Sequence, residues 1–157
     1  MLDQRKLPHE VVYQHYESAA EIAQAIKDMV VRGAPAIGHS AAFAMAIEAL
    51  NIGESDDWVS ALAEARKVLA ESRPTAVNLF WVLDRCDQII AQAEDVPSAL
   101  SYFAERLFEL DIEDNKRMGD FGASLLGANA TVYTHCNAGA LATAGYGTAL
   151  GVIRSAH

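Results

Sequence analysis

Apolar residues at helical spacing dominate this chain and restrict its first part to a helical fold. After Ser18 they recur every three or four positions, as in Ile22 and Ile26, and form one apolar face per helix. Ser18 and Glu21 have the form of a capping box, in which a hydroxyl and a carboxylate satisfy free N–H groups at a helix start. The pattern therefore predicts a helical domain of five helices at residues 18–126.

Breaks between the predicted helices are marked by glycine and proline. Arg32-Gly33-Ala34-Pro35 must end the first helix, because glycine permits unusual backbone angles and proline disfavours helix in the residue before it. Asn51–Ser55 is predicted to be a turn, with the cap of the next helix at Ser55 or Asp56. Arg73-Pro74-Thr75 is another break. Two of these breaks therefore place an arginine beside glycine or proline.

The pattern changes only near the end of the chain, where a strand is predicted at Ala130–His135. This run is β-branched and aromatic and follows a turn that contains Gly127. A glycine-rich turn and a helix come next, which is the opening unit of a parallel sheet. The predicted fold class is therefore α/β overall, with an extended lead-in at 1–17, the helical bundle at 18–126, and the first strand-loop-helix of an incomplete Rossmann-like sheet at 127–157.

Charge and hydropathy exclude two large classes of protein. The formal net charge is -9 and no run of Lys or Arg occurs, so no nucleic-acid partner is expected. The longest apolar stretch, Ala34 to Leu50, is interrupted by His39 and Glu48, which predicts a buried helix and no membrane contact. Met1 to Glu10 lacks the apolar core of a signal peptide. The two cysteines have no disulfide pattern, so we expect a cytoplasmic protein.

Cys136 is the first candidate for chemistry. It follows the predicted strand and precedes a glycine-rich turn and a helix, which is where α/β sheets bind ligands. Helix N-termini and nearby cations activate cysteines at such places. The alternative is a small apolar residue packed beside the sheet. Cys86, which lies on a predicted helix among hydrophobic residues, is expected to belong to the core.

The glycines after the predicted strand suggest a backbone cradle for a phosphate, with Gly139 nearest the strand. Their spacing fits a dinucleotide fingerprint poorly, because Gly145 and Gly147 lie far from the strand end. The alternative is close packing of the helix on the sheet. Asn137 stands in the same turn, where its amide can orient substrate hydroxyls or bond to the backbone. Gly139 and Asn137 are therefore candidate substrate contacts.

Arg32 and Arg73 are the candidate phosphate ligands. At a helix break, an arginine side chain and free backbone N–H groups can converge on one anion. The alternative for each arginine is a solvated side chain or an ion pair at the surface. The five histidines show no spacing typical of metal ligands, so we expect neither a metal nor a cofactor.

Several segments together resemble the signature segments of the methylthioribose-1-phosphate isomerase family, in the same order and with fitting separations. They are Asp28–Gly38, Ser72–Leu79, Thr134–Ala142 and Gly145–Gly151, and Asp3–Pro8 is similar to an early segment of that family. The wider group shares its fold with ribose-1,5-bisphosphate isomerase and with regulatory subunits of the translation initiation guanine-exchange factor. The cysteine-containing segment favours the methylthioribose branch.

This resemblance implies an aldose–ketose isomerase that converts 5-methylthioribose 1-phosphate to 5-methylthioribulose 1-phosphate in methionine salvage. It implies Cys136 as the catalytic cysteine. It also implies a set of residues that hold the substrate phosphate: Arg32, Gly33, Ala34 and Arg73. The alternatives are a ribose-1,5-bisphosphate isomerase, a regulatory relative that senses a sugar phosphate or nucleotide without turning it over, and a fragment of an NAD-binding protein.

Members of that family continue with the rest of the α/β domain, which includes a catalytic aspartate. We therefore expect this chain to be an N-terminal fragment or one of two chains, and to be inactive as an isomerase alone. Its expected partners are the sugar-phosphate substrate, the remaining catalytic domain, and a second copy in a homodimer.

Overall fold

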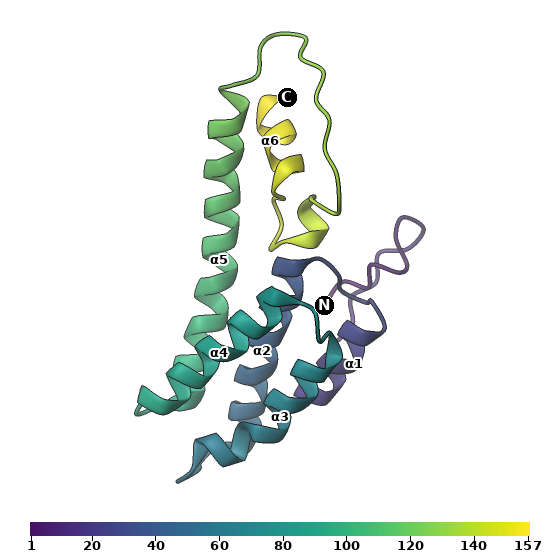
Figure 1. The fold of residues 1–157 in the computed structure, drawn as a ribbon. Coiled ribbons are helices and arrows are strands. Elements are labelled where there is room, and N and C mark those ends of the chain that lie inside the picture. The colour runs from purple at the N-terminus through teal and green to yellow at the C-terminus, as the bar shows by residue number, and fades with distance from the viewer.

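Six α-helices and one short 3-10 helix make up the computed structural model, which describes residues 1–157 (Figure 1). The elements are α1 (Ala19–Lys27), α2 (Ala34–Ile52), α3 (Trp58–Ser72), α4 (Val77–Gln92), α5 (Val96–Ala123), η1 (Ala140–Ala142) and α6 (Ala149–Ala156). The prediction of five helices before residue 126 is confirmed. None of the helices combines the length and the apolar character that crossing a membrane requires.

Local signals start α1 much as the sequence predicted. The Ser18 hydroxyl accepts a hydrogen bond from the Glu21 N–H at 3.2 Å. The Glu21 carboxylate accepts one from the Glu17 N–H at 2.7 Å, one residue further back than a capping box requires. The cap of α3 also differs from the prediction, because the Asp57 carboxylate, rather than Ser55 or Asp56, accepts the hydrogen bond from the Ser60 N–H.

The hydrophobic core lies among α1 to α5 and is centred on α2. The alanines of α2 from Ala36 onwards are almost fully buried, because α1, α3, α4 and α5 all pack against this helix. Small side chains let these neighbours approach closely. A methyl group at Gly38 would lie 3.2 Å from the Val82 side chain of α4. The start of α4 is therefore fixed against the first turns of α2.

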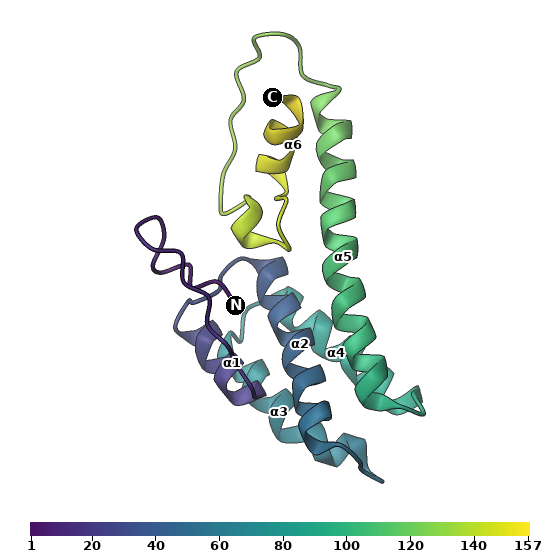
Figure 2. The same cartoon turned by 180° about the vertical axis from the view of Figure 1, so that it is seen from behind.

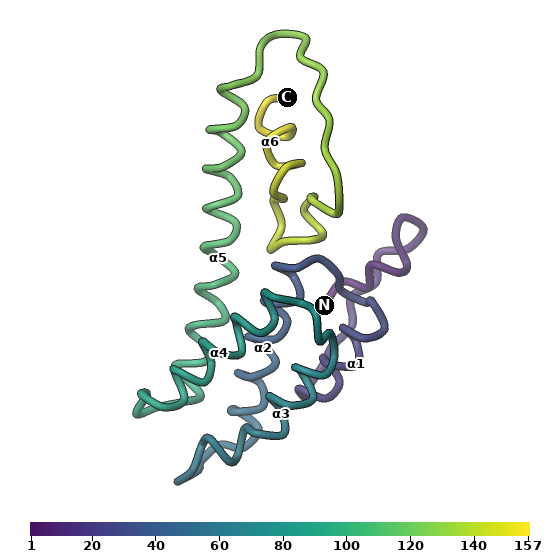
Figure 3. Tube along the Cα trace, in the orientation of Figure 1, coloured from purple at the N-terminus to yellow at the C-terminus, as the bar shows by residue number.

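The predicted strand at Ala130–His135 is not formed. The segment leads from the end of α5 back towards α2 as extended chain without a strand partner (Figure 3). Its Tyr133 side chain is 89% exposed. A strand requires a neighbour for its N–H and C=O groups, so β-branched composition alone could not produce one here. The Rossmann-like sheet expected at 127–157 is therefore not confirmed, although the helix expected after it is present as α6.

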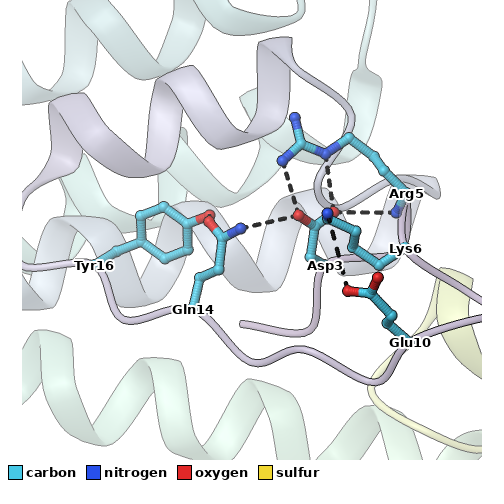
Figure 4. A network of polar contacts seen from close by, with 6 residues as sticks. All are labelled: Asp3, Arg5, Lys6, Glu10, Gln14 and Tyr16. Atoms are coloured by element: carbon cyan, nitrogen blue, oxygen red, sulfur yellow. Dashed lines mark hydrogen bonds and ion pairs between the residues drawn. The ribbon is translucent and has the colours of Figure 1, made fainter.

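The N-terminal residues form a narrow hairpin that projects from the side of the helices (Figure 2). Leu2 and Tyr13 pair as an antiparallel bridge at its base. The buried Asp3 carboxylate accepts hydrogen bonds from Arg5 Nε at 2.9 Å, Arg5 Nη2 at 2.8 Å and Gln14 Nε2 at 2.9 Å (Figure 4). The hydrogen bonds from the Arg5 side chain lower the pKa of Asp3. The lead-in predicted to be extended is thus folded back on itself and fixed by a buried carboxylate.

Candidate functional site

The predicted break at Arg32–Pro35 forms a tight turn in front of α2, the Gly33 turn. Gly33 has a φ of 107°, a conformation that side-chain-bearing residues rarely adopt. A side chain also has no room, since a methyl group there would lie 2.5 Å from the Cα of Ala142. Ala34 opens α2, whose first N–H groups have no partner within the helix. These free N–H groups and the exposed Arg32 guanidinium are the kinds of donor that bind an anion at the start of a helix.

Cys136 begins a second loop, the glycine loop (residues 136–148). Its thiol is exposed, and its φ of 73° is unusual for a residue with a side chain. Such conformations cluster at functional sites, because the surrounding structure has to hold them in place. Asn137, the next residue, is exposed as well. The sequence-predicted thiol is therefore accessible and stands at a conformationally special position.

Hydrogen bonds close the glycine loop on itself. Gly139 and Gly147 form an antiparallel bridge. The Thr143 hydroxyl oxygen accepts hydrogen bonds from the N–H groups of Gly145 at 3.3 Å and Gly147 at 3.1 Å. A methyl group at Gly147 would lie 3.0 Å from the Ala138 carbonyl oxygen. Gly147 thus permits close backbone packing within the loop, which differs from both interpretations of the glycine spacing, a phosphate cradle and packing of a helix on a sheet.

The glycine loop packs directly against the Gly33 turn. The contact is the one between Gly33 and Ala142, and η1 accordingly lies at the start of α2 (Figure 1). Two segments far apart in the sequence, each predicted to contain site residues, are therefore neighbours in the fold. The Gly33 turn carries the predicted site residues Arg32, Gly33 and Ala34, and the glycine loop carries Cys136, Asn137 and Gly139.

Arg73 lies at the break between α3 and α4, which approaches the same end of α2. Its carbonyl oxygen accepts a hydrogen bond from the Ala76 N–H at 3.0 Å. One turn later, the Asn78 carbonyl oxygen would lie 3.4 Å from a methyl group at Gly38. This packing brings the Arg73 break towards the first turns of α2. That Arg32 and Arg73 share one anion remains a prediction.

Neither of these two guanidinium groups is paired within the chain. Arg32 is exposed and Arg73 is half-buried, and no ion pair or side-chain hydrogen bond involves either. By contrast, Arg5, Arg66 and Arg106 all pair with carboxylates. The two alternatives to phosphate binding were a solvated side chain and an ion pair at the surface. Neither arginine forms an ion pair, so both side chains are solvated and remain available to an external anion.

Two polar residues beside the site, the buried His39 and the half-buried Asp111, were not predicted. His39 Nε2 lies 3.6 Å from Asp111 Oδ2, which is too long for a hydrogen bond, and neither ring nitrogen has a partner. Asp111 Oδ2 accepts a hydrogen bond from the Ala144 N–H of the glycine loop at 2.7 Å. Burial raises the pKa of Asp111, but the His39 imidazole and the Ala144 N–H outweigh this effect and hold it below its usual value. Asp111 therefore faces the site as a carboxylate.

Two clefts border the loops that meet here. One of about 660 Å³ is largely apolar and lies between the N-terminal hairpin, α2, α5 and residues 140–145 of the glycine loop. The other, of about 570 Å³, lies between α2, α4 and α5 and is lined in part by Pro35, Asn78 and Asp111. Ligand pockets for small molecules commonly fall within this range of volumes. None of the predicted site residues, such as Arg32, Arg73 and Cys136, lines either cleft, so the two clefts lie beside the predicted site and do not describe it.

The two thiols should differ strongly in reactivity, because only Cys136 is exposed. Cys86 is buried in α4, where burial raises its pKa to about 12. The thiolate is the reactive form, so the Cys86 thiol should be almost inert in the folded chain. We expect titration with 5,5′-dithiobis(2-nitrobenzoate) to show one fast thiol in the native chain and the second only in denaturant.

Single substitutions assign the two phases of that titration. Cys136→Ser should remove the fast phase, and Cys86→Ser should leave it unchanged. A fast phase that survives in Cys136→Ser would show that the accessible thiol has been assigned to the wrong residue.

Comparison with known proteins gives consistent matches for the whole chain. Residues 30–157 match the family described as the Initiation factor 2 subunit family. The methylthioribose-1-phosphate isomerase of Thioalkalivibrio sulfidiphilus is 51% identical over 159 residues, and that of Pseudomonas aeruginosa is 52% identical over 165 residues. Both alignments cover 100% of this chain but 46% of the relative. The chain therefore spans about half the length of the curated relatives it matches.

Solved structures share the same arrangement. The 5-methylthioribose 1-phosphate isomerase from Pyrococcus horikoshii matches with a TM-score of 0.88 and 38% identity, over 98% of this chain and 45% of that chain. The translation initiation factor eIF-2B, subunit delta, from A. fulgidus matches with a TM-score of 0.86 and 41% identity, over 99% of this chain and 47% of that chain. Because nearly the whole chain is covered, the similarity includes the glycine loop as well as the helices.

Proposed function

The chain belongs to the Initiation factor 2 subunit family, and from this premise we propose that it is the N-terminal part of a methylthioribose-1-phosphate isomerase. The relatives that are about half identical to it carry that name. The observation that carries the proposal is the contact between Gly33 and Ala142, which brings the Gly33 turn, where we propose that the phosphate binds, to the loop that begins with Cys136. An isomerase acting on a sugar phosphate needs both elements in one site.

The proposed reaction converts an aldose 1-phosphate into the corresponding ketose. The phosphate blocks the anomeric oxygen, so the sugar ring must open before hydrogen moves from C2 to C1. Cys136 acts as one of two proton-transfer groups, since its thiol is exposed at the start of the loop that packs on the Gly33 turn. The second group, an acid kept in the required protonation state by burial, belongs to the part of the isomerase fold that follows these residues.

Binding of the phosphate orients the sugar in this proposal. Arg32, Arg73 and the first N–H groups of α2 hold the phosphate, which offsets its charge and fixes the substrate relative to the thiol. The unpaired state of both guanidinium groups supports this role. Asn137 and the backbone of Gly139 contact the sugar, because they stand close after Cys136 on the same loop.

The remaining fold, the assembly and the location are proposals as well. A Rossmann-like sheet completed by further strands would pair with residues 130–135, whose Val132 and Tyr133 side chains are exposed. We place the enzyme in the cytoplasm as a homodimer. The two unpaired cysteines support a reducing compartment.

A regulatory or ribose-1,5-bisphosphate-specific relative is the second candidate. The similarity to the eIF-2B delta subunit favours it, since that protein matches this chain as well as the isomerase does. The exposed thiol favours the isomerase, because a protein that only senses a sugar phosphate has no need of a reactive thiol at this loop.

A fusion protein can test the proposal directly. Residues 1–157 replace the matching region of the Thioalkalivibrio sulfidiphilus isomerase, and ketose formation from 5-methylthioribose 1-phosphate is followed by 13C nuclear magnetic resonance. We expect turnover from the fusion and none from residues 1–157 alone. Ribose 1,5-bisphosphate serves as the competing substrate. Binding of either sugar phosphate without turnover would support the regulatory candidate, and turnover by the isolated chain would show that its catalytic set is complete.

A further inference from the structure

Gln4 joins three segments that are distant in the sequence. Its backbone N–H donates a hydrogen bond to the Val30 carbonyl oxygen at 2.9 Å, just before the Gly33 turn. Its side-chain Nε2 donates to the carbonyl oxygen of Leu141, in η1, at 2.7 Å. Gln4 is 8% exposed, so water does not readily replace either partner. The residue thus links the Gly33 turn to the glycine loop through the N-terminal hairpin.

The position of Gln4 is itself fixed by its neighbour Asp3. The Asp3 N–H donates to the Val12 carbonyl oxygen at 2.9 Å. Its carboxylate binds the Arg5 and Gln14 side chains, as Figure 4 shows. This network closes the base of the hairpin on both sides of Gln4. The Gln4 side chain is therefore presented to Leu141 from a rigid support.

Asp111 makes the matching link from the opposite side. Its carboxylate accepts the hydrogen bond from the Ala144 N–H, and Ala144 and Leu141 stand on either side of Ala142, which contacts Gly33. Asn115 Nδ2 donates to the backbone oxygen of Asp111 at 2.7 Å within α5. The acceptor is therefore held by a helix that also packs on α2.

These two hydrogen bonds are the only ones that join the glycine loop to residues 1–126. All other hydrogen bonds of the loop run within it or to α6. Because the two links flank the contact with Gly33, they determine how the loop is seated on the helical part. An exposed loop without them would be held only by apolar contacts, which do not fix direction.

We propose that Gln4 and Asp111 are positioning residues for the reaction: through Leu141 and Ala144 they set the place of the glycine loop, and with it Cys136, relative to the Gly33 turn. The part of this inference that concerns catalysis rests on the proposed function. The part that concerns the position of the glycine loop on the helices does not rest on the proposed function, so it can be measured in the chain itself.

Amide hydrogen exchange, read by mass spectrometry on the full chain, tests the seating. Gln4→Met keeps the shape of the side chain but removes the donor, and Asp111→Leu removes the acceptor. Each should raise exchange at residues 138–147 about tenfold, because a lost buried hydrogen bond destabilises the closed state locally. Helices α1 to α4 should keep their protection in both variants.

Matched controls separate this effect from substitution in general. Gln24→Met removes a side-chain hydrogen bond of the same 2.7 Å length, to Asp28 on the exposed side of α1. Asp114→Leu changes an exposed carboxylate one turn after Asp111 on α5. Neither should alter exchange in the glycine loop. If Gln4→Met and Asp111→Leu behave like these controls, the loop is not seated by the two links.

The fusion enzyme tests the catalytic consequence. Gln4→Met and Asp111→Leu should lower kcat about tenfold with a smaller change in KM, since the substrate phosphate is still bound while the thiol is displaced. Asp111→Asn keeps an oxygen acceptor for the Ala144 N–H and should restore most of kcat and of the exchange protection. Increased exchange with unchanged kcat would reduce both residues to a structural role. If the unsubstituted fusion does not turn over, the proposed function fails while the exchange result still decides the seating.

Discussion

Replacing Cys136 by serine should lower the turnover number of the fusion enzyme by about 10²–10⁴-fold, the usual contribution of a general acid or base. Serine has nearly the same shape, but its hydroxyl is a far weaker acid than the thiol. The thiol is exposed at the start of the glycine loop and does not support the core, so folding should be unaffected. The KM should change by only about a factor of two to three, because the residues proposed to bind the phosphate lie on other elements. Steady-state kinetics of ketose formation would measure both constants.

Cys86→Ser is the matched control for this experiment. Cys86 is fully buried in α4, so a serine there leaves a hydroxyl in apolar surroundings. We expect a loss of about 1–3 kcal/mol in the free energy of unfolding and an unchanged kcat. Unaltered turnover in Cys136→Ser would end the catalytic role of this thiol, whatever the result at Cys86.

Gly33→Ala should strongly destabilise the folded chain. The φ of 107° is strained for alanine, which costs roughly 1–2 kcal/mol. The added methyl group would also lie 2.5 Å from both Cα and Cβ of Ala142, so backbone must move to admit it. Overpacking of this kind typically adds about 1–3 kcal/mol. Urea unfolding of the full chain should therefore show a loss of about 2–5 kcal/mol.

Two other glycines separate the strain from the steric conflict. Gly53 has a φ of 78° with no atom within 4 Å of an added methyl group, so Gly53→Ala should show only the strain. Gly127 has open space and no positive φ, and Gly127→Ala should be nearly neutral. A Gly33→Ala variant no less stable than Gly53→Ala would mean that the glycine loop does not press on the Gly33 turn.

The helical part of the fold could be predicted because its signals are local. Ser18 and Glu21 mark the start of α1 within one turn of chain, and glycine and proline mark the breaks. Errors at this level were small, such as the cap at Asp57 one or two residues beyond the expected position. The strand at 130–135 is not confirmed, for the opposite reason. Strand formation depends on a partner, and residue types cannot supply one.

The candidate site could be predicted only in part. Arg32, Gly33 and Cys136 stand in recognisable segments, and the contact between Gly33 and Ala142 brings those segments together. Gln4 and Asp111 were missed, because each is linked to the loop by one hydrogen bond between residues distant in the sequence. Gln4 bonds to Leu141, 137 positions away, and Asp111 bonds to Ala144, 33 positions away. No pattern of neighbouring residues indicates such a pair, since either residue alone is an ordinary polar side chain.

The continuity of α5 determines the order in which the chain can fold as it leaves the ribosome. The first half of α5 packs on α2, where Phe108 meets Phe43, and it can do so as soon as it emerges. The second half packs on α6 instead, with Gly119 against Ser155 and Gly122 against Val152. Those partners are synthesised only after the whole of α5. The final turns of α5 therefore stay uncovered until α6 leaves the ribosome, and the glycine loop between the two helices becomes ordered only then.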